Sequence, residues 1–138
     1  MSQLQSVLML LGRILIGIPA LFFGIILIVY WSEISQILEG RHIPVTWVWI
    51  ILAILFLFIG SVSIILGYKA RIGAILLMLT LIGSSFTLDG FWNPTQSSPP
   101  NSWIICNNMA IFGGLIYLFT FGSGSISLDK KERKREIL

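Results

Sequence analysis

The chain has 138 residues, of which 56% are hydrophobic and only 11% are charged, and its mean hydropathy is +0.92. Soluble domains carry about a quarter charged residues, so this composition indicates an integral membrane protein and excludes both a soluble domain and a disordered tail. A single cysteine, Cys106, and a single histidine, His42, exclude an internal disulfide, a dithiol redox pair, a zinc cluster and a bis-histidine haem.

Four apolar segments follow one another along the chain, at residues 7–31, 45–68, 72–88 and 103–121. As helices they would be about 25 to about 37 Å long, which matches a hydrocarbon core of roughly 30 Å. Backbone groups inside lipid find no water, and the hydrophobicity is continuous rather than alternating, so each segment is expected to be helical. The sequence predicts an all-α, four-transmembrane-helix bundle as a single domain over residues 1–128, followed by a basic tail at 129–138.

The Lys and Arg residues are divided unequally between the two ends of these predicted helices. Eight of the nine fall on one side, and only Arg41 falls on the other. By the positive-inside rule, both termini are predicted to be cytoplasmic, in a prokaryotic inner (plasma) membrane or a thylakoid membrane. The basic tail is explained by this topology or, alternatively, by docking on anionic lipid or a partner. Nucleic acid is not an expected partner, because the tail is short and interleaved with acids.

Small and polar residues recur at helical spacing in three of the predicted spans. Because helices in lipid associate through small residues and buried polar groups, these stripes predict where the helices pack together. They comprise Gly17 and Gly24 in the first span, Gly60, Ser63 and Gly67 in the second, and Asn107, Ala110, Gly114 and Tyr117 in the fourth.

Arg13 lies inside the first predicted span, roughly 9 Å from its start by helical rise. A charged side chain at this depth is costly unless it is satisfied. It has two alternatives: it extends to the inner headgroups, or it turns inward toward carbonyls, a carboxylate or an anionic ligand. The sequence leaves both open.

Several polar residues gather at the outer ends of the predicted spans and form one layer. Amide, carboxylate and aromatic groups at one depth suit a shallow pocket for a small polar molecule or a quinone headgroup. Alternatively, the asparagines cap or join helices and the carboxylates are solvated. No metal site is expected and the catalytic residues are unknown. The layer consists of Glu33, Asp89, Asn107 and Asn108 with Trp92 nearby. These five residues and, separately, Arg13 near the inner end of the first span are the candidate ligand-binding residues.

The order of several motifs resembles that of DoxX-type membrane proteins over about residues 10 to 130. The motifs are Arg13-Ile-Leu-Ile-Gly17, Leu66-Gly67-Tyr68-Lys69-Ala70-Arg71, Phe91-Trp92-Asn93, Asn108-Met-Ala110 with Gly113-Gly114-Leu115, and Ser127-Leu128-Asp129. The resemblance implies a four-helix membrane fold and, in some members, quinone-coupled sulfur oxidation or thiol stress defence; other relatives look like chaperones or cargo receptors. Thr87-Leu88-Asp89-Gly90 stands where many members have a histidine, and Tyr30-Trp31-Ser32-Glu33 stands where many have a lysine motif.

The resemblance and the outer polar layer together lead to a functional expectation. The chain is expected to be a small quinone- or ligand-binding subunit of a membrane oxidoreductase, with quinone as the possible cofactor and no catalysis on its own. The alternative is a non-catalytic accessory subunit of a larger respiratory or photosynthetic complex. Expected partners are the lipid bilayer and either other membrane subunits or further copies of the chain. A channel or transporter is disfavoured, because no span shows a discontinuous helix with convergent charges.

Overall fold

The computed structural model describes residues 2–87 and 102–138. Over these residues the chain forms six helices and no strand, so the all-α class predicted from the sequence is confirmed for them. The helices are α1 (Gln3–Val29), α2 (Trp31–Gly40), α3 (Thr46–Leu66), α4 (Ala70–Thr87), α5 (Ser102–Phe121) and α6 (Leu128–Ile137).

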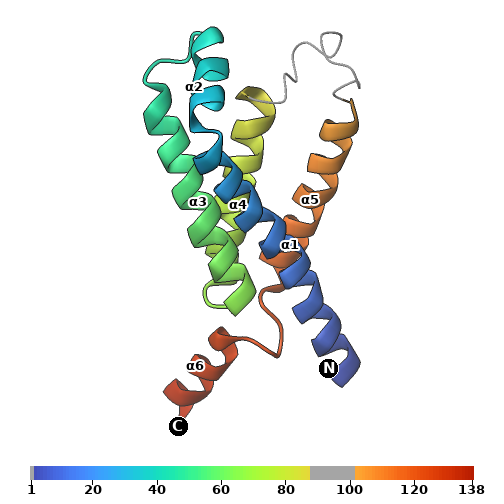
Figure 1. Ribbon diagram of the computed structural model, residues 1–138. Coiled ribbons are helices and arrows are strands. Elements are labelled where there is room, and N and C mark those ends of the chain that lie inside the picture. Colours follow the sequence, from blue (N-terminus) through green and yellow to red (C-terminus); the bar gives the residue numbers. More distant parts are fainter. Residues whose placement is uncertain (1, 88–101) are drawn as a thin grey trace.

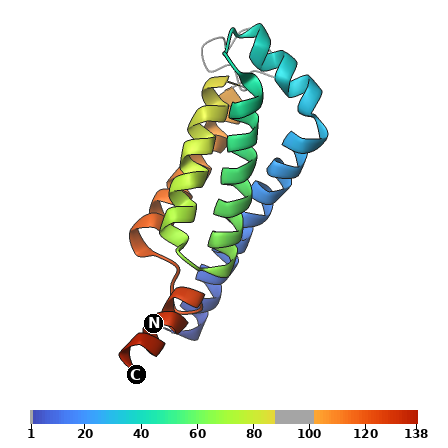
Figure 2. The ribbon, with the colours of Figure 1, turned by 90° about the vertical axis from the view of Figure 1, so that its left-hand side faces the viewer.

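The four long helices, α1, α3, α4 and α5, run alternately up and down (Figures 1 and 2). Helix α3 packs against both α1 and α4, and α4 packs against α5, whereas α1 and α5 make few contacts. Helix α2 lies at one end of the molecule, and α6 and both termini lie at the other (Figure 1). An even number of long helices therefore brings the start and the end of the chain to the same side.

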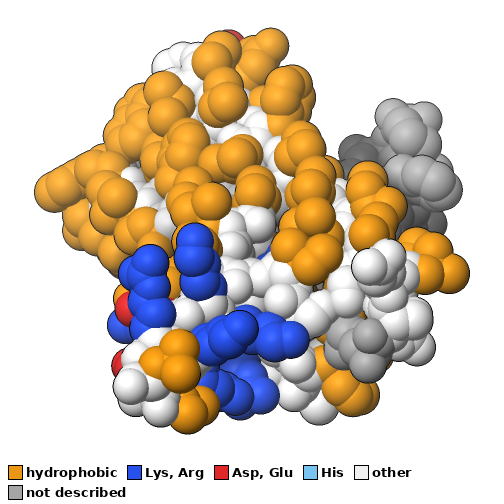
Figure 3. Space-filling view, turned by 90° about the horizontal axis from the view of Figure 1, so that it is seen from below, with side chains coloured by type: hydrophobic (Ala, Val, Ile, Leu, Met, Phe, Trp, Pro, Cys, Tyr) orange, Lys and Arg blue, Asp and Glu red, His pale blue; other side chains and the backbone are white. Residues whose placement is uncertain are grey.

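The outer surface of the bundle is strongly hydrophobic. Leu15 and Phe22, for example, expose 72% and 63% of their surface. Helices α1 and α3 are long and apolar enough to cross a membrane, and Ala70–Phe86 and Cys106–Phe121 form two shorter apolar helices. Figure 3 shows hydrophobic side chains over much of the molecule and Lys and Arg side chains gathered at the end that carries the termini. A surface of this kind is suited to contact with lipid.

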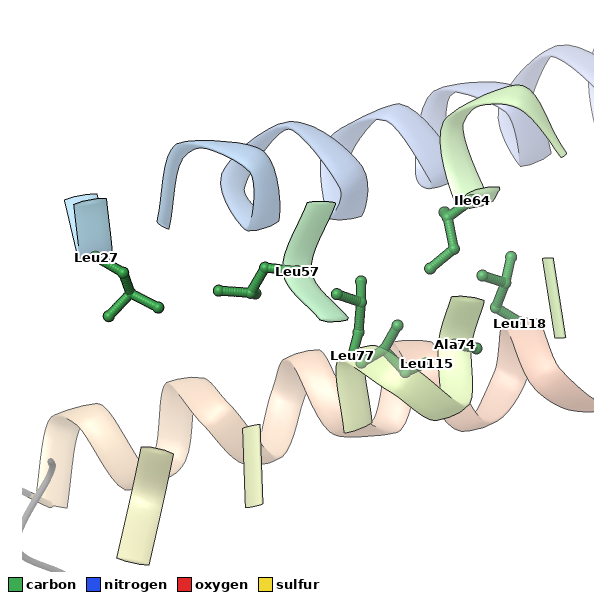
Figure 4. Close-up of a cluster of buried hydrophobic side chains, with 7 residues drawn as sticks. All are labelled: Leu27, Leu57, Ile64, Ala74, Leu77, Leu115 and Leu118. Atoms are coloured by element: carbon green, nitrogen blue, oxygen red, sulfur yellow. The ribbon is translucent and has the colours of Figure 1, made fainter. Parts of the chain in front are cut away.

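Residues from all four long helices meet in one buried hydrophobic cluster (Figure 4). Ile64 and Leu115 are fully buried in it, on α3 and α5 respectively. The cluster fixes the helices against one another by close packing rather than by polar contacts. Its members are Leu27, Leu57, Ile64, Ala74, Leu77, Leu115 and Leu118.

Small residues set the distance between α3 and α4. A Cβ atom added at Gly73 would lie 2.8 Å from the carbonyl oxygen of Gly60, and one added at Gly60 would lie 3.0 Å from the carbonyl oxygen of Gly73. Gly17 of α1 approaches α3 as closely, since its Cβ would lie 2.4 Å from Cγ1 of Ile65. The stripes predicted for the first and second spans are therefore helix contacts, as small residues in membrane helices often are.

The structure departs from the sequence analysis in two places. Between the first two predicted spans, where the sequence analysis predicts no helix, most of helix α2 (Trp31–Gly40) is found, and its Leu38 is buried. The stripe predicted for the fourth span was wrong for three of its four residues, because Asn107, Ala110 and Tyr117 are exposed, whereas Gly114 lies near Ile16 of α1. Helix α5 instead turns Leu115 and Leu118 to the core. An almost uniformly apolar helix gives no strong amphipathic signal, so composition alone did not identify its buried face.

Candidate functional site

Arg13 of α1 points into the protein rather than toward the membrane surface. Its side chain is only 2% exposed, and its Nη2 donates a hydrogen bond to the carbonyl oxygen of Ile126. The carboxylate of Asp129 interacts electrostatically with the same guanidinium. Within the described part of the chain, Nε and Nη1 of Arg13 have no hydrogen-bond partner. Of the two alternatives that the sequence left open, the structure shows the inward one.

Gly67, at the carboxyl end of α3, makes room for this guanidinium. Gly67 has a φ of 69°, the left-handed conformation that commonly ends a helix and that glycine adopts without strain. A Cβ atom at this position would lie 2.0 Å from Nη1 of Arg13. The helix end and the buried cation therefore depend on the same glycine.

Asp129 connects the start of α6 to the turn between α3 and α4. Its Oδ1 accepts a hydrogen bond from the backbone N–H of Lys69 at 2.8 Å, and its Oδ2 accepts one from the hydroxyl of Ser123 at 3.4 Å. Its own backbone N–H donates to the carbonyl oxygen of Gly67 at 3.2 Å. We refer to Arg13, Gly67, Lys69, Ile126 and Asp129 as the terminal junction.

Hydrogen bonds fix the loop before α6 to helix α1 and to the first turn of α6. Ser125 shares a hydrogen bond with Ser6 of α1, and the hydroxyl of Ser127 donates to the carbonyl oxygen of Gly124 at 3.1 Å. Ser127 also caps α6, since its hydroxyl accepts a hydrogen bond from the N–H of Lys130 at 3.3 Å. The terminal junction thus ties the end of the chain to α1 and to the α3–α4 turn.

A second feature, the apolar pocket, lies near the opposite end of the bundle and has a volume of about 470 Å³. Helix α2 contributes Ile34 and Leu38 to its wall. Its two hydroxyl groups are bound to their own helix, because Thr80 donates to Leu76 at 2.9 Å and Ser84 to Leu81 at 3.1 Å. The remaining lining is alkyl, aromatic or glycine: Phe23, Leu27, Ile43, Trp49, Ile50, Leu52, Ala53, Phe56, Leu79 and Gly83.

The candidate residues predicted from the sequence lie in different parts of the molecule. Arg13 belongs to the terminal junction, whereas Glu33 is exposed on α2 at the far end (Figure 1). Asn107 is exposed, but Asn108 is half-buried and its Nδ2 donates to the hydroxyl of Ser85 at 2.9 Å, which joins α5 to α4. Two further candidates, Asp89 and Trp92, lie outside the described residues.

The described residues contain no group of three or more His, Cys, Asp or Glu side chains that could hold a metal ion. The sequence analysis missed the pocket and the role of Asp129. A signal for the pocket existed in α2, where Ile34, Ile37 and Leu38 recur at the spacing of an amphipathic helix. Asp129 carried no comparable signal, because its partners lie far from it in the sequence.

Comparison with known proteins gives the relationships of the chain. The family model described as the SURF4 family matches residues 1–135. The Surfeit locus protein 4 homolog of Schizosaccharomyces pombe is 32% identical over 51% of this chain and 24% of the relative. The ER-derived vesicles protein ERV29 of Saccharomyces cerevisiae is 30% identical over 64% of this chain and 27% of the relative. The chain thus spans about a quarter of the length of these two proteins.

A bacterial relative matches over almost its whole length. The inner membrane protein YphA of Escherichia coli is 25% identical over 92% of this chain and 91% of the relative. No solved structure matches the chain.

These matches correct the functional expectation drawn from the sequence. The resemblance to DoxX-type proteins was wrong, because the family model that covers the chain is that of the SURF4 family. Both functional expectations were therefore wrong as well: the quinone-binding subunit of an oxidoreductase and its alternative, the accessory subunit of a respiratory or photosynthetic complex. The short motifs behind that resemblance consist mostly of small and apolar residues, which occur in many membrane helices. The protein is a multi-pass membrane protein, and the chain belongs to the SURF4 family.

Proposed function

We propose that this chain is a receptor-type membrane protein that holds an apolar segment of a client polypeptide in the apolar pocket. The observation that carries the proposal is the pocket itself, which is large and hydrophobic and is formed by four helices. Binding sites of this kind are concave and mostly apolar. Since the two hydroxyls in the wall already donate to backbone carbonyls, the pocket offers van der Waals contact rather than acid–base chemistry.

Helix α2 gives the proposed pocket its shape. Leu38, which is 4% exposed, and Ile34 place the apolar face of α2 against the ends of α1 and α3. Polar residues are adjacent in sequence to two lining residues: Glu33 precedes Ile34 on α2, and Ser85, which accepts a hydrogen bond from Asn108, follows Ser84 on α4. In this proposal Glu33 and Asn108 form a polar rim that orients a client whose apolar part enters the pocket.

The names of two relatives support a membrane setting for this role. One of them carries the name ER-derived vesicles protein, which associates that relative with vesicles derived from the ER. The match over 91% of a bacterial inner membrane protein supports the inner (plasma) membrane of a prokaryote as the location. The shared element would then be the bundle that binds the client.

The membrane arrangement is part of the same proposal. Helices α1, α3, α4 and α5 would cross the bilayer as a four-helix bundle over residues 1–128, with both termini and the 129–138 tail in the cytoplasm. A Cys106→Ser background with a single new cysteine, Ser2→Cys or Gly40→Cys, tests this arrangement in sealed inside-out and right-side-out vesicles. Position 2 should react with an impermeant maleimide only from the cytoplasmic side and position 40 only from the other. Labelling of both from one side would contradict the topology.

Photocrosslinking tests the receptor role. Benzoylphenylalanine is introduced in place of Leu52, which lines the pocket, or in place of Ile59, which is 56% exposed on the same helix and does not line it. After irradiation of native membranes, position 52 should give a discrete polypeptide adduct that mass spectrometry identifies, and position 59 should not. Adducts of lipid alone at position 52, or the same polypeptides from both positions, would overturn the proposal.

A further inference from the structure

A third feature lies at the end of the bundle that carries the termini, between the start of α4, the end of α5 and helix α6. It is a groove of about 790 Å³, and we refer to it as the basic groove. Its exposed cations come from three places: Lys69 from the turn between α3 and α4, Arg71 from the start of α4, and Lys130 and Arg133 from α6. We propose that the basic groove binds the headgroup of an anionic phospholipid.

Charge supports this occupant. Helix α6 carries five basic and three acidic residues, and Lys69 and Arg71 add two further cations to the same end. Three carboxylates also line the groove, but that of Asp129 already accepts hydrogen bonds from Lys69 and Ser123. Four cations against three carboxylates leave the groove lining with a net positive charge, which attracts an anionic headgroup.

The backbone at the groove allows a close approach of the Arg71 guanidinium. A Cβ atom at Gly122 would lie 3.7 Å from Nε and 3.9 Å from Nη2 of Arg71, so this side chain lies against a glycine with a φ of 75°. From this position beside Gly122, the exposed guanidinium of Arg71 can present its planar fork of N–H donors to a phosphate. Arg71 is therefore the cation of the groove best placed to bind a phosphodiester.

Apolar side chains in the same groove favour a lipid over a soluble phosphate. Ile72 of α4 and Phe121 of α5 line it and expose 53% and 62% of their surface. Beyond them, Ile75 and Tyr117 continue the exposed apolar surface along the two helices. A phospholipid would place its phosphate among the cations and its acyl chains along this apolar surface. This arrangement corresponds to the boundary between the headgroups and the hydrocarbon core of a bilayer.

The test compares the binding of three ligands to the purified protein and the effect of removing cations inside and outside the basic groove. Wild-type protein in a neutral detergent is mixed with phosphatidylglycerol, phosphatidylcholine or glycerol 3-phosphate, and retained lipid and the unfolding temperature are measured by native mass spectrometry and thermal denaturation. The variant Arg71→Gln/Arg133→Gln removes two cations of the groove. The control Lys131→Gln/Lys134→Gln removes two cations of the same helix that do not line it.

Wild type and control should retain phosphatidylglycerol over phosphatidylcholine and be stabilised by it, and the groove variant should lose that preference severalfold. Three outcomes would overturn the proposal. The first is wild-type protein with no preference for the anionic lipid. The second is an equal loss in both double variants, which indicates diffuse charge attraction. The third is equal stabilisation by glycerol 3-phosphate, which indicates a site for a soluble phosphate.

Discussion

The carboxylate of Asp129 accepts a hydrogen bond at 2.8 Å from the backbone N–H of Lys69, which lies 60 residues earlier in the chain. Lys69 has a φ of 47°, a left-handed conformation that is uncommon for a residue other than glycine. The hydrogen bond places a negative charge at the start of α4, where the helix dipole is positive. The side chain of Asp129 thus stabilises the left-handed turn at Lys69 and the start of α4, and it attaches α6 to both.

Replacing Asp129 should therefore loosen the terminal junction. We expect Asp129→Ala to lower the free energy of unfolding by about 1 to 2 kcal/mol, because a hydrogen bond to a charged acceptor is lost at a half-buried position. Asp129→Asn keeps an acceptor oxygen and should cost less. Thermal unfolding in detergent micelles measures both. Glu132→Gln on the same helix is the control and should stay within about 0.5 kcal/mol of wild type; an equal loss there would contradict the specific role of Asp129.

Arg13 and Asp129 should be energetically coupled. Arg13→Met removes the buried guanidinium together with its hydrogen bond to Ile126, and Asp129→Asn removes the opposite charge. Either change alone leaves the opposite charge less well compensated. The double variant should therefore lose less free energy of unfolding than the sum of the losses in the two single variants. We expect a coupling free energy of at least about 0.5 kcal/mol from a double-mutant cycle. Strict additivity would show that the two side chains act independently.

The close approach of α3 and α4 gives a steric prediction. In Gly73→Ala, the new Cβ would lie 2.8 Å from the carbonyl oxygen of Gly60 and 2.9 Å from Cβ of Ser63, so the two helices must separate. We expect a loss of about 1 to 3 kcal/mol, as for other overpacked sites. Gly113→Ala is the matched control, because nothing lies within 4 Å of its Cβ. The control should be neutral or slightly stabilising, since alanine favours helix over glycine by up to about 1 kcal/mol.

The sequence predicts helix contacts made by glycines better than it predicts the direction in which apolar and charged side chains point. Gly17 and Gly24 were identified correctly as contact residues, because glycine at helical spacing is informative even in an apolar helix. The lining of the pocket was not identified, because a leucine such as Leu52 or Leu79 is equally suited to face lipid or a cavity. The sequence does not distinguish the two positions. The inward direction of Arg13 required knowledge of Ile126, a partner 113 residues away.

The hydrogen bond between Asn108 and Ser85 should contribute modestly to the contact between α4 and α5. Asn108→Leu removes the donor, and we expect a loss of about 0.6 kcal/mol and at most about 1.7 kcal/mol, the range found for hydrogen bonds between membrane helices. Asn107→Leu is a matched control, because Asn107 is adjacent in sequence and exposed. Unfolding in detergent measures both variants. A larger effect at position 107 would show that the contribution of position 108 has been assigned wrongly.

Filling the apolar pocket should abolish client binding without disturbing the bundle. Gly83 lines the pocket and nothing lies within 4 Å of a Cβ placed there, so Gly83→Leu adds an isobutyl group without a steric clash at its Cβ. The matched control is Gly113→Leu, which is equally open at its Cβ and does not line the pocket. We expect Gly83→Leu to reduce the polypeptide adduct formed from position 52 by about tenfold, equivalent to about 1.4 kcal/mol of binding free energy. Thermal unfolding should show both variants folded. If Gly83→Leu is folded and its adduct is undiminished, the client does not occupy the pocket, and the polypeptide detected at position 52 binds elsewhere on the surface.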